Sequence, residues 1–217
     1  AVETSEKGLA IMKSNRVRLL ILILHLATMA VAQETPWQKY MEAAGRSSQQ
    51  GNYGEAEKLL LDALKEAEKF GSGDARLGAT LGELAAVFRA QGKYGEAEPL
   101  YKRSLAIREK ALGSDHAEVA TSLYNLAELY YAQGKYVEAE PLFQRSLAIY
   151  QKAFGPDHPA VANNLYNLGG VYQGQGKYAE AEAFYRRAVA VYERSLGPDH
   201  QEVAATLGNV GSVARTP

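Results

Sequence analysis

The chain has 217 residues, 47% of them hydrophobic, and a formal net charge of −1 at pH 7. A chain of this length and composition can bury a core as one or two compact domains or as a modest repeat array, and its lack of a basic excess argues against a nucleic-acid-binding function. The chain contains no cysteine, which excludes disulfides, thiolate zinc sites and thiol nucleophiles.

The first predicted element is a secretory signal peptide over residues 1–32, with residues 1–11 as an upstream extension. Basic residues at 13–18 precede an apolar run at 19–29, and Ala30-Val31-Ala32 has the small-x-small pattern that signal peptidase cleaves. An uncleaved N-terminal anchor is the alternative, although the run is shorter than the ~20 residues that span a bilayer. Cleavage before Gln33 leaves 20 basic and 23 acidic residues and predicts a secreted or periplasmic protein that is not attached to a membrane.

The remainder, residues 33–217, repeats itself with a period of about 42. The turn sequence G-x-Y recurs at Gly51, Gly92, Gly134 and Gly176, and the apolar residues between turns follow the helical period. Each unit is therefore predicted to be a helix, a tight turn and a second helix. Since neither helix can bury its apolar side alone, the units are expected to stack on one another. The predicted repeats span about 37–70, 79–112, 121–154 and 163–196, with a partial fifth at 203–217.

This pattern resembles the tetratricopeptide repeat. In the third unit the signature positions hold Leu123, Leu126, Ala127, Tyr130, Gly134, Tyr136, Ala139 and Phe143. The longer period and the recurring phrases "EAEPL", "RSLAI" and "GPDH" resemble the kinesin-light-chain subtype, here as a bacterial and exported member. The resemblance implies an all-α, right-handed superhelical solenoid of antiparallel helix pairs.

The recurring pairs Asp115-His116, Asp157-His158 and Asp199-His200 raise the question of a metal site. Equivalent residues of stacked repeats lie about 10 Å apart, whereas ligands of one ion lie about 2 Å from it, so no metal is expected. The aspartates are predicted to cap the following helices instead. Arginines at 103, 145 and 187 lie near glutamates at 98, 140 and 182 and are interpreted as a solvated charge ladder.

The resemblance also indicates a binding surface, because in this family certain positions between the signature residues of each first helix line the concave face. The candidate peptide-binding residues are Asn125, Asn167, Asn209, Tyr124, Tyr166, Glu83, Arg89, Glu128, Tyr131 and Asn163. The asparagines recur every 42 residues, and each offers a donor and an acceptor. Kinesin-light-chain-like arrays use equivalent asparagines to bind the backbone of an extended peptide. The alternative is that they are a subfamily habit on a solvated face.

The last segment, residues 201–214, matches the first helix of a fifth repeat and has an apolar side. This side makes the segment a candidate for self-association, unless a partner or a later part of an intact relative covers it.

The leading hypothesis is a non-catalytic scaffold, without cofactor or catalytic residue, that binds an extended peptide or protein segment in its concave groove. The sequence GQGK at 174–177 lacks the spacing of a phosphate-binding loop. An alternative is a truncated N-terminal sensor or interaction region of a larger enzyme or signalling protein. A third hypothesis is a self-assembling structural module.

Overall fold

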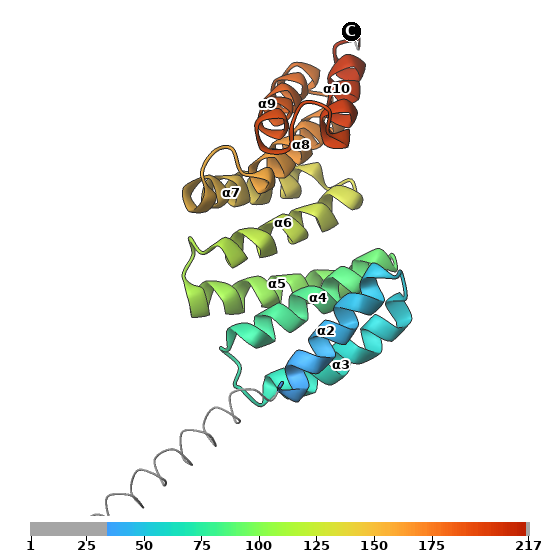
Figure 1. Ribbon diagram of the computed structural model, residues 1–217, viewed down its shortest axis with the longest axis vertical. Helices are drawn as coiled ribbons and strands as arrows, with labels where there is room; N and C mark the ends of the chain where they lie inside the picture. The colour runs from blue at the N-terminus through green and yellow to red at the C-terminus, as the bar shows by residue number, and fades with distance from the viewer. Residues whose placement is uncertain (1–33, 216–217) are drawn as a thin grey trace, which may run out of the picture.

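The computed structural model describes residues 34–215, which form helices joined by short turns (Figure 1). The predicted signal peptide lies outside the described residues. Within residues 34–215 there are nine helices and no strand, which confirms the all-α prediction. The helices are α2 (Pro36–Gln49), α3 (Tyr53–Glu68), α4 (Ala75–Ala90), α5 (Tyr94–Leu112), α6 (Ala117–Ala132), α7 (Tyr136–Phe154), α8 (Pro159–Gly174), α9 (Tyr178–Leu196) and α10 (Gln201–Val213).

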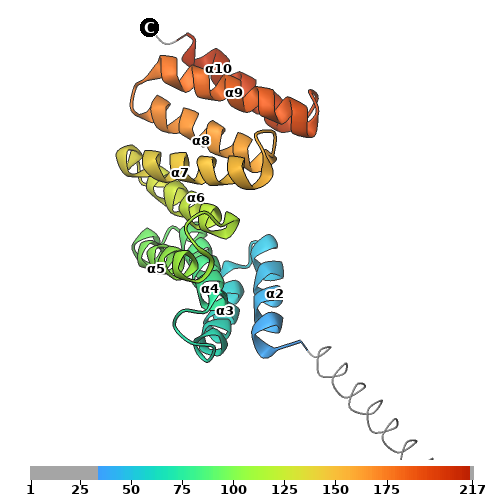
Figure 2. The same ribbon diagram turned by 90° about the vertical axis from the view of Figure 1, so that its left-hand side faces the viewer.

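The helices form antiparallel pairs that stack in chain order. α2 packs on α3, α4 on α5, α6 on α7 and α8 on α9, and each pair contacts the next mainly through its second helix. Figures 1 and 2 show the resulting elongated, curved array, with α10 covering one end. In the second to fourth pairs, the first helix begins four residues before the start of the predicted repeat, because the signature positions begin one turn inside that helix.

Glycine permits the tight turn between the two helices of each pair. Gly51, Gly92, Gly134 and Gly176 have φ between 71° and 75°, a left-handed conformation that costs other residues about 1 kcal/mol or more. The turn reverses the chain within a few residues and places the two helices side by side.

Histidine, not aspartate, caps the start of three first helices. The Nδ1 atoms of His116, His158 and His200 accept hydrogen bonds from the backbone N–H groups of Glu118, Ala160 and Glu202, at 3.2, 3.1 and 3.3 Å. This satisfies one of the donors that the first turn of a helix leaves without a partner. The predicted aspartate caps are therefore wrong in these repeats, because the cap is the residue directly before the helix and the aspartate stands one position earlier.

The aspartates at two of these positions instead tie the loop to a long second helix. Asp115 accepts a hydrogen bond from Lys152 Nζ at 2.6 Å, and Asp157 accepts one from Arg194 Nε at 2.8 Å. Each ion pair joins the start of a repeat to the end of its own second helix. All four side chains are more than half exposed, so each pair contributes little to stability.

Small residues bring the helices of a pair close together. Ala97, Ala139 and Ala181 on the second helices are fully buried. On α5 and α7, Ser104 and Ser146 also lie in the interface, and their hydroxyls donate to backbone carbonyls of the first helix at 2.7 and 2.9 Å. These hydroxyls therefore keep their hydrogen bonds without water, as a buried donor requires.

Glutamates near the start of the second helices link consecutive repeats. The carboxylate of Glu57 accepts hydrogen bonds from Gln91 and Lys93 in the next turn, both at 3.0 Å. These bonds, the one from Gln91 foremost, lower the pKa of Glu57.

Equivalent links follow at the next two interfaces. Glu98 accepts from the hydroxyl of Tyr130 at 3.0 Å, and Glu140 accepts from the hydroxyl of Tyr172 at 2.8 Å. The predicted ladder between the arginines and these glutamates is wrong: Arg145, for example, lies 2.7 Å from Glu109. The glutamates point towards the following layer, which the residue spacing along one helix did not indicate.

Candidate functional site

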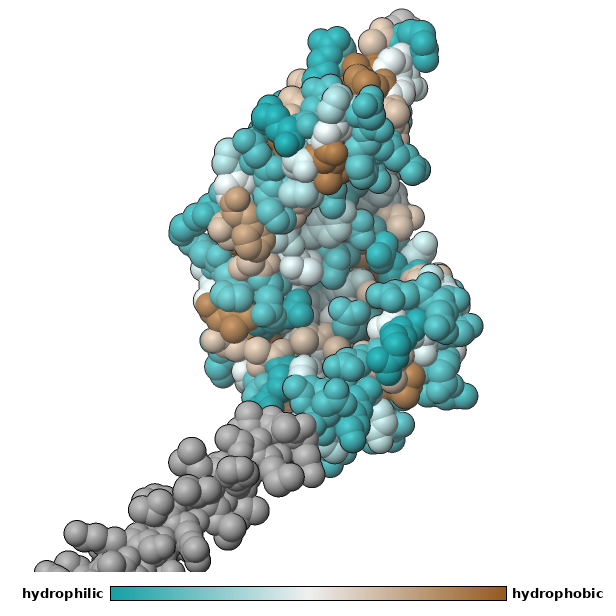
Figure 3. All heavy atoms as spheres, in the orientation of Figure 1, coloured by the Kyte–Doolittle hydropathy of each residue, from teal (hydrophilic) through white to brown (hydrophobic). Residues whose placement is uncertain are grey.

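The first helices α4, α6, α8 and α10 carry all ten candidate residues. One face of the molecule, seen in Figure 3, is mostly hydrophilic, and its hydrophobic residues form separate spots. A binding surface on this array is therefore expected to combine polar contacts with small apolar hollows rather than one large apolar patch.

Tyrosine and asparagine side chains form a ladder between consecutive first helices. Asn167 on α8 donates from Nδ2 to the hydroxyl of Tyr124 on α6 at 2.8 Å, and Asn209 on α10 donates in the same way to Tyr166 on α8 at 3.0 Å. Asn167 and Asn209 are thus each held in place by the preceding repeat. Asn125 lacks the equivalent bond, because Gly82 stands where the tyrosine would be.

A polar hollow of about 290 Å³ adjoins this ladder, and five of the ten candidate residues line it. Its lining residues are Tyr124, Glu128, Asn163, Tyr166, Asn167, Tyr192 and Glu202. The hydroxyl of Tyr192, on α9, donates to Asn163 Oδ1 at 2.6 Å. Burial raises the pKa of the Tyr124 and Tyr192 hydroxyls above the ordinary value.

The other five candidate residues do not line this hollow; they are Asn125, Asn209, Arg89, Tyr131 and Glu83. Arg89 on α4 forms an ion pair with Glu128 on α6 at 3.1 Å, which neutralises that carboxylate. Tyr131 packs edge-on against Tyr136, with ring centroids 5.6 Å apart. Glu83 does not contribute to the polar hollow and lines a different one.

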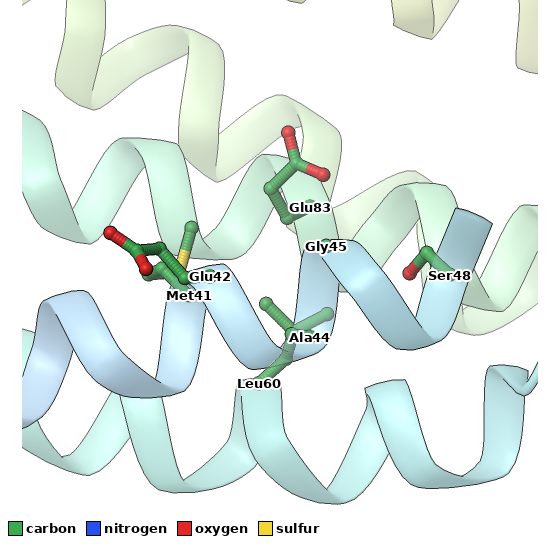
Figure 4. A pocket seen from close by; sticks show the side chains of 7 residues that line it. All are labelled: Met41, Glu42, Ala44, Gly45, Ser48, Leu60 and Glu83. Carbon is green, nitrogen blue, oxygen red and sulfur yellow. The ribbon is translucent and has the colours of Figure 1, made fainter. Parts of the chain in front are cut away.

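This second hollow, of about 350 Å³, lies between α2 and α4 (Figure 4). Its lining residues are Met41, Glu42, Ala44, Gly45, Ser48, Leu60 and Glu83. The first repeat departs most from the repeat signature, and small residues at its inner positions leave this space open. Of these residues, only Glu83 was predicted from the sequence to bind a peptide.

The described residues offer little for metal chemistry or for membrane insertion. No three His, Cys, Asp or Glu side chains among residues 34–215 lie close enough to hold a metal ion. None of the helices in this range combines the length and apolar content that a membrane span requires.

Comparisons with known proteins agree with this architecture. The sequence profile of the tetratricopeptide repeat family matches residues 47–110, 76–152, 118–194 and 162–216. The chain belongs to the tetratricopeptide repeat family. A search of curated proteins gave no match.

Solved structures place this tetratricopeptide repeat protein near the kinesin-light-chain subtype. Two crystal structures of a Podosopora anserina protein, described as having "kinesin light chain nearly identical TPR-like repeats", are 28% identical to it. One is of a variant with a single substitution and has a TM-score of 0.73, and the other has a TM-score of 0.72. Both alignments cover 84% of this chain and 88% of the other.

The bacterial kinesin-light-chain-like protein BtubC from P. vanneervenii shares the fold, at 24% identity and a TM-score of 0.72 over 79% of this chain and 69% of that one. Tetratricopeptide repeat arrays are generally protein-interaction scaffolds, and this subtype is typically non-enzymatic.

Sequence reasoning missed two residues that line the polar hollow of this tetratricopeptide repeat array, Tyr192 on the second helix α9 and Glu202 on α10. The sequence contained a signal for Tyr192, because tyrosine also occupies the equivalent position 42 residues earlier, at Tyr150. In the structure, Tyr150 shares a 2.7 Å hydrogen bond with Thr121 of its own repeat. The same pair recurs as Tyr192 and Asn163. The predicted site residues all came from the first helices, so Tyr192 on a second helix was not among them.

Proposed function

We propose that this tetratricopeptide repeat protein is a non-catalytic scaffold that holds an extended protein segment in its concave groove. The observation that carries the proposal is the ladder that fixes Asn167 and Asn209, the first of which lines the polar hollow. An amide has two N–H donors and an acceptor oxygen, so one bond to tyrosine leaves the other donor and the oxygen for a ligand.

The ladder favours binding because it orders the asparagines in advance. A flexible side chain loses about 0.5–1.5 kcal/mol of rotamer freedom when a ligand immobilises it, and a side chain already held by a tyrosine hydroxyl loses less. Backbone amides of an extended segment offer donors and acceptors that match such a row, independent of the segment's own sequence.

Peptide binding by asparagine variants tests the proposal. A displayed peptide library provides ligands, and titration calorimetry compares the wild type with the Asn125→Ala/Asn167→Ala double variant. Each lost hydrogen bond weakens binding by about 0.5–1.5 kcal/mol, so the double variant is expected to bind about tenfold more weakly. Arg103→Ala is the control, because Arg103 is exposed on the second helix α5. Failure to find any peptide ligand, or an effect of Arg103 without an effect of the asparagines, would contradict the proposal.

A second candidate function is the interaction region of a larger enzyme or signalling protein, and it is supported by the exposed side of α10. Leu207 is 50% exposed, whereas Leu81, Leu123 and Leu165 at the equivalent positions are at most 2% exposed. In those three repeats the leucine belongs to a hydrophobic core cluster that includes residues of the second helix of its own pair. A further helix, a partner or a second copy of the chain would cover it here.

A further inference from the structure

We infer that the segment bound in the groove carries a basic side chain beside a large apolar one, that the apolar side chain fills the hollow between α2 and α4, and that the basic one lies at its rim beside Glu83. This inference rests on the proposed groove function and specifies the chemistry of its ligand. It is carried by the shape of the hollow, the apolar character of its floor and the charge at its rim.

The floor of the hollow is apolar. Ala44 and Leu60 form it and are almost fully buried, and Met41 lines one end (Figure 4). Its volume of about 350 Å³ lies at the small end of the range for ligand clefts, about 300–1,000 Å³. The space therefore suits one large apolar side chain rather than a cofactor.

Gly45 keeps the hollow open. It lies within α2, and a Cβ atom built on it would meet no other atom within 4 Å. Glycine in the middle of a helix is destabilising relative to alanine, because the unfolded chain has more conformational freedom there. The empty space above Gly45 is what an inserted side chain would fill.

The rim carries unbalanced negative charge. Glu83 is exposed and forms no ion pair within residues 34–215. It stands at the ladder position that asparagine holds in later repeats, but the residue that would face it from the preceding repeat is Met41, whose thioether is only a weak acceptor. The ladder is therefore interrupted here, and the carboxylate is free to bind a cation from outside.

The cations near this part of the groove each have another partner, although the Arg108 guanidinium also interacts electrostatically with Glu83 without forming an ion pair with it. Glu42 lies 3.8 Å from Arg46, and both side chains are more than half exposed, so this pair is weak. Arg89 is engaged by Glu128 at 3.1 Å. Arg108 donates to the hydroxyl of Ser122 at 2.9 Å and lies 3.5 Å from Glu118. Charge complementarity thus favours a lysine or arginine of the ligand next to Glu83.

Two variants test the inference on the purified chain, with labelled peptides selected from the same displayed library. In each peptide the basic residue is replaced by glutamate, or the neighbouring apolar residue by serine. For the wild type, each replacement is expected to weaken binding about tenfold, and the basic peptides are expected to bind more weakly as salt screens the charges.

Glu83→Lys is expected to reverse the charge preference, so that the glutamate-containing peptides bind better than the basic ones. Gly45→Leu is expected to fill the hollow and to abolish discrimination between the apolar and the serine peptides. Gly54→Leu is the matched control, because Gly54 also has open space around its Cβ position but lies on α3, outside the hollow. Thermal denaturation followed by circular dichroism tests whether each variant is folded.

The outcomes separate this inference from the proposed function. One outcome is that the peptides bind the Asn125→Ala/Asn167→Ala variant more weakly than the wild type but show no preference for basic or apolar residues. This result would overturn the inference and leave the groove function standing. The absence of any peptide ligand would overturn both. Self-association of the chain that Gly45→Leu abolishes and Gly54→Leu does not would identify a second copy as the occupant, and would also overturn the inference.

Discussion

The residue directly before each first helix from α4 onwards caps the N-terminus of that helix, but the capping group differs between repeats. Asp74 caps α4 with a carboxylate, whereas histidine imidazoles cap α6, α8 and α10. The Asp74 carboxylate makes an interaction that the imidazoles do not make, because it also binds the side chain of Arg76. Its oxygens accept hydrogen bonds from the backbone N–H of Arg76 and from the guanidinium, at 2.8–2.9 Å.

This cap predicts a specific dependence of stability on pH. The hydrogen bonds from Arg76 lower the pKa of Asp74 from 3.8 to about 2. A lowered pKa means that the carboxylate stabilises the folded state above 3.8, and that this contribution disappears as the pH falls towards 2. Asp74→Ala is therefore expected to lower the melting temperature at neutral pH, and the difference from wild type is expected to shrink between these two values.

Thermal denaturation followed by circular dichroism, at a series of pH values, measures this difference. Asp74→Asn is the matched control, because it keeps an oxygen that can cap the helix and removes only the charge. A melting-temperature difference for Asp74→Ala that stays constant across the series would show that the ionised carboxylate does not contribute.

At the scale of helices, the contact between the members of a pair depends on side-chain size. Ala139 on α7 is fully buried, and a larger side chain would force α6 and α7 apart. Ala139→Leu is expected to lower the free energy of unfolding by about 1–3 kcal/mol, measured by chemical denaturation. Ala148→Leu on the same helix is the control, because Ala148 is exposed. Equal stability of the two variants would mean that the assigned repeat register is wrong.

The helices could be predicted from the sequence, but the ladder between them could not be read from the repeat period alone. Helix pairs follow from local periodicity and from the glycine turns, which every repeat restates. Tyr124 and Asn167 are 43 residues apart, as are Tyr166 and Asn209, one more than the period. Their contact depends on how one layer is rotated on the next. The hollow beside Gly45 was also missed, because a space left by small residues has no sequence motif.

For the whole molecule, the prediction from the sequence is export. Signal peptidase accepts small side chains at the two positions that Ala30 and Ala32 occupy. Expression in a Gram-negative host is therefore expected to yield periplasmic protein whose first residue is Gln33, determined by N-terminal sequencing and fractionation. Ala32→Lys should block cleavage and leave a longer chain. Cytosolic wild-type protein with an intact N-terminus would contradict the prediction.

The glutamate links between layers have a consequence for how the array loses structure. Glu57, Glu98 and Glu140 each reach no further than the adjacent repeat, while Glu182 binds Arg186 of its own helix at 2.6 Å. Coupling between nearest neighbours alone makes the array behave like a one-dimensional chain. Within residues 34–215, a layer with two neighbours is held from both sides, and the first and last layers from one. Amide hydrogens of α6 and α7 should then exchange with solvent more slowly than those of α2 or α10, so that unfolding proceeds inward from the ends.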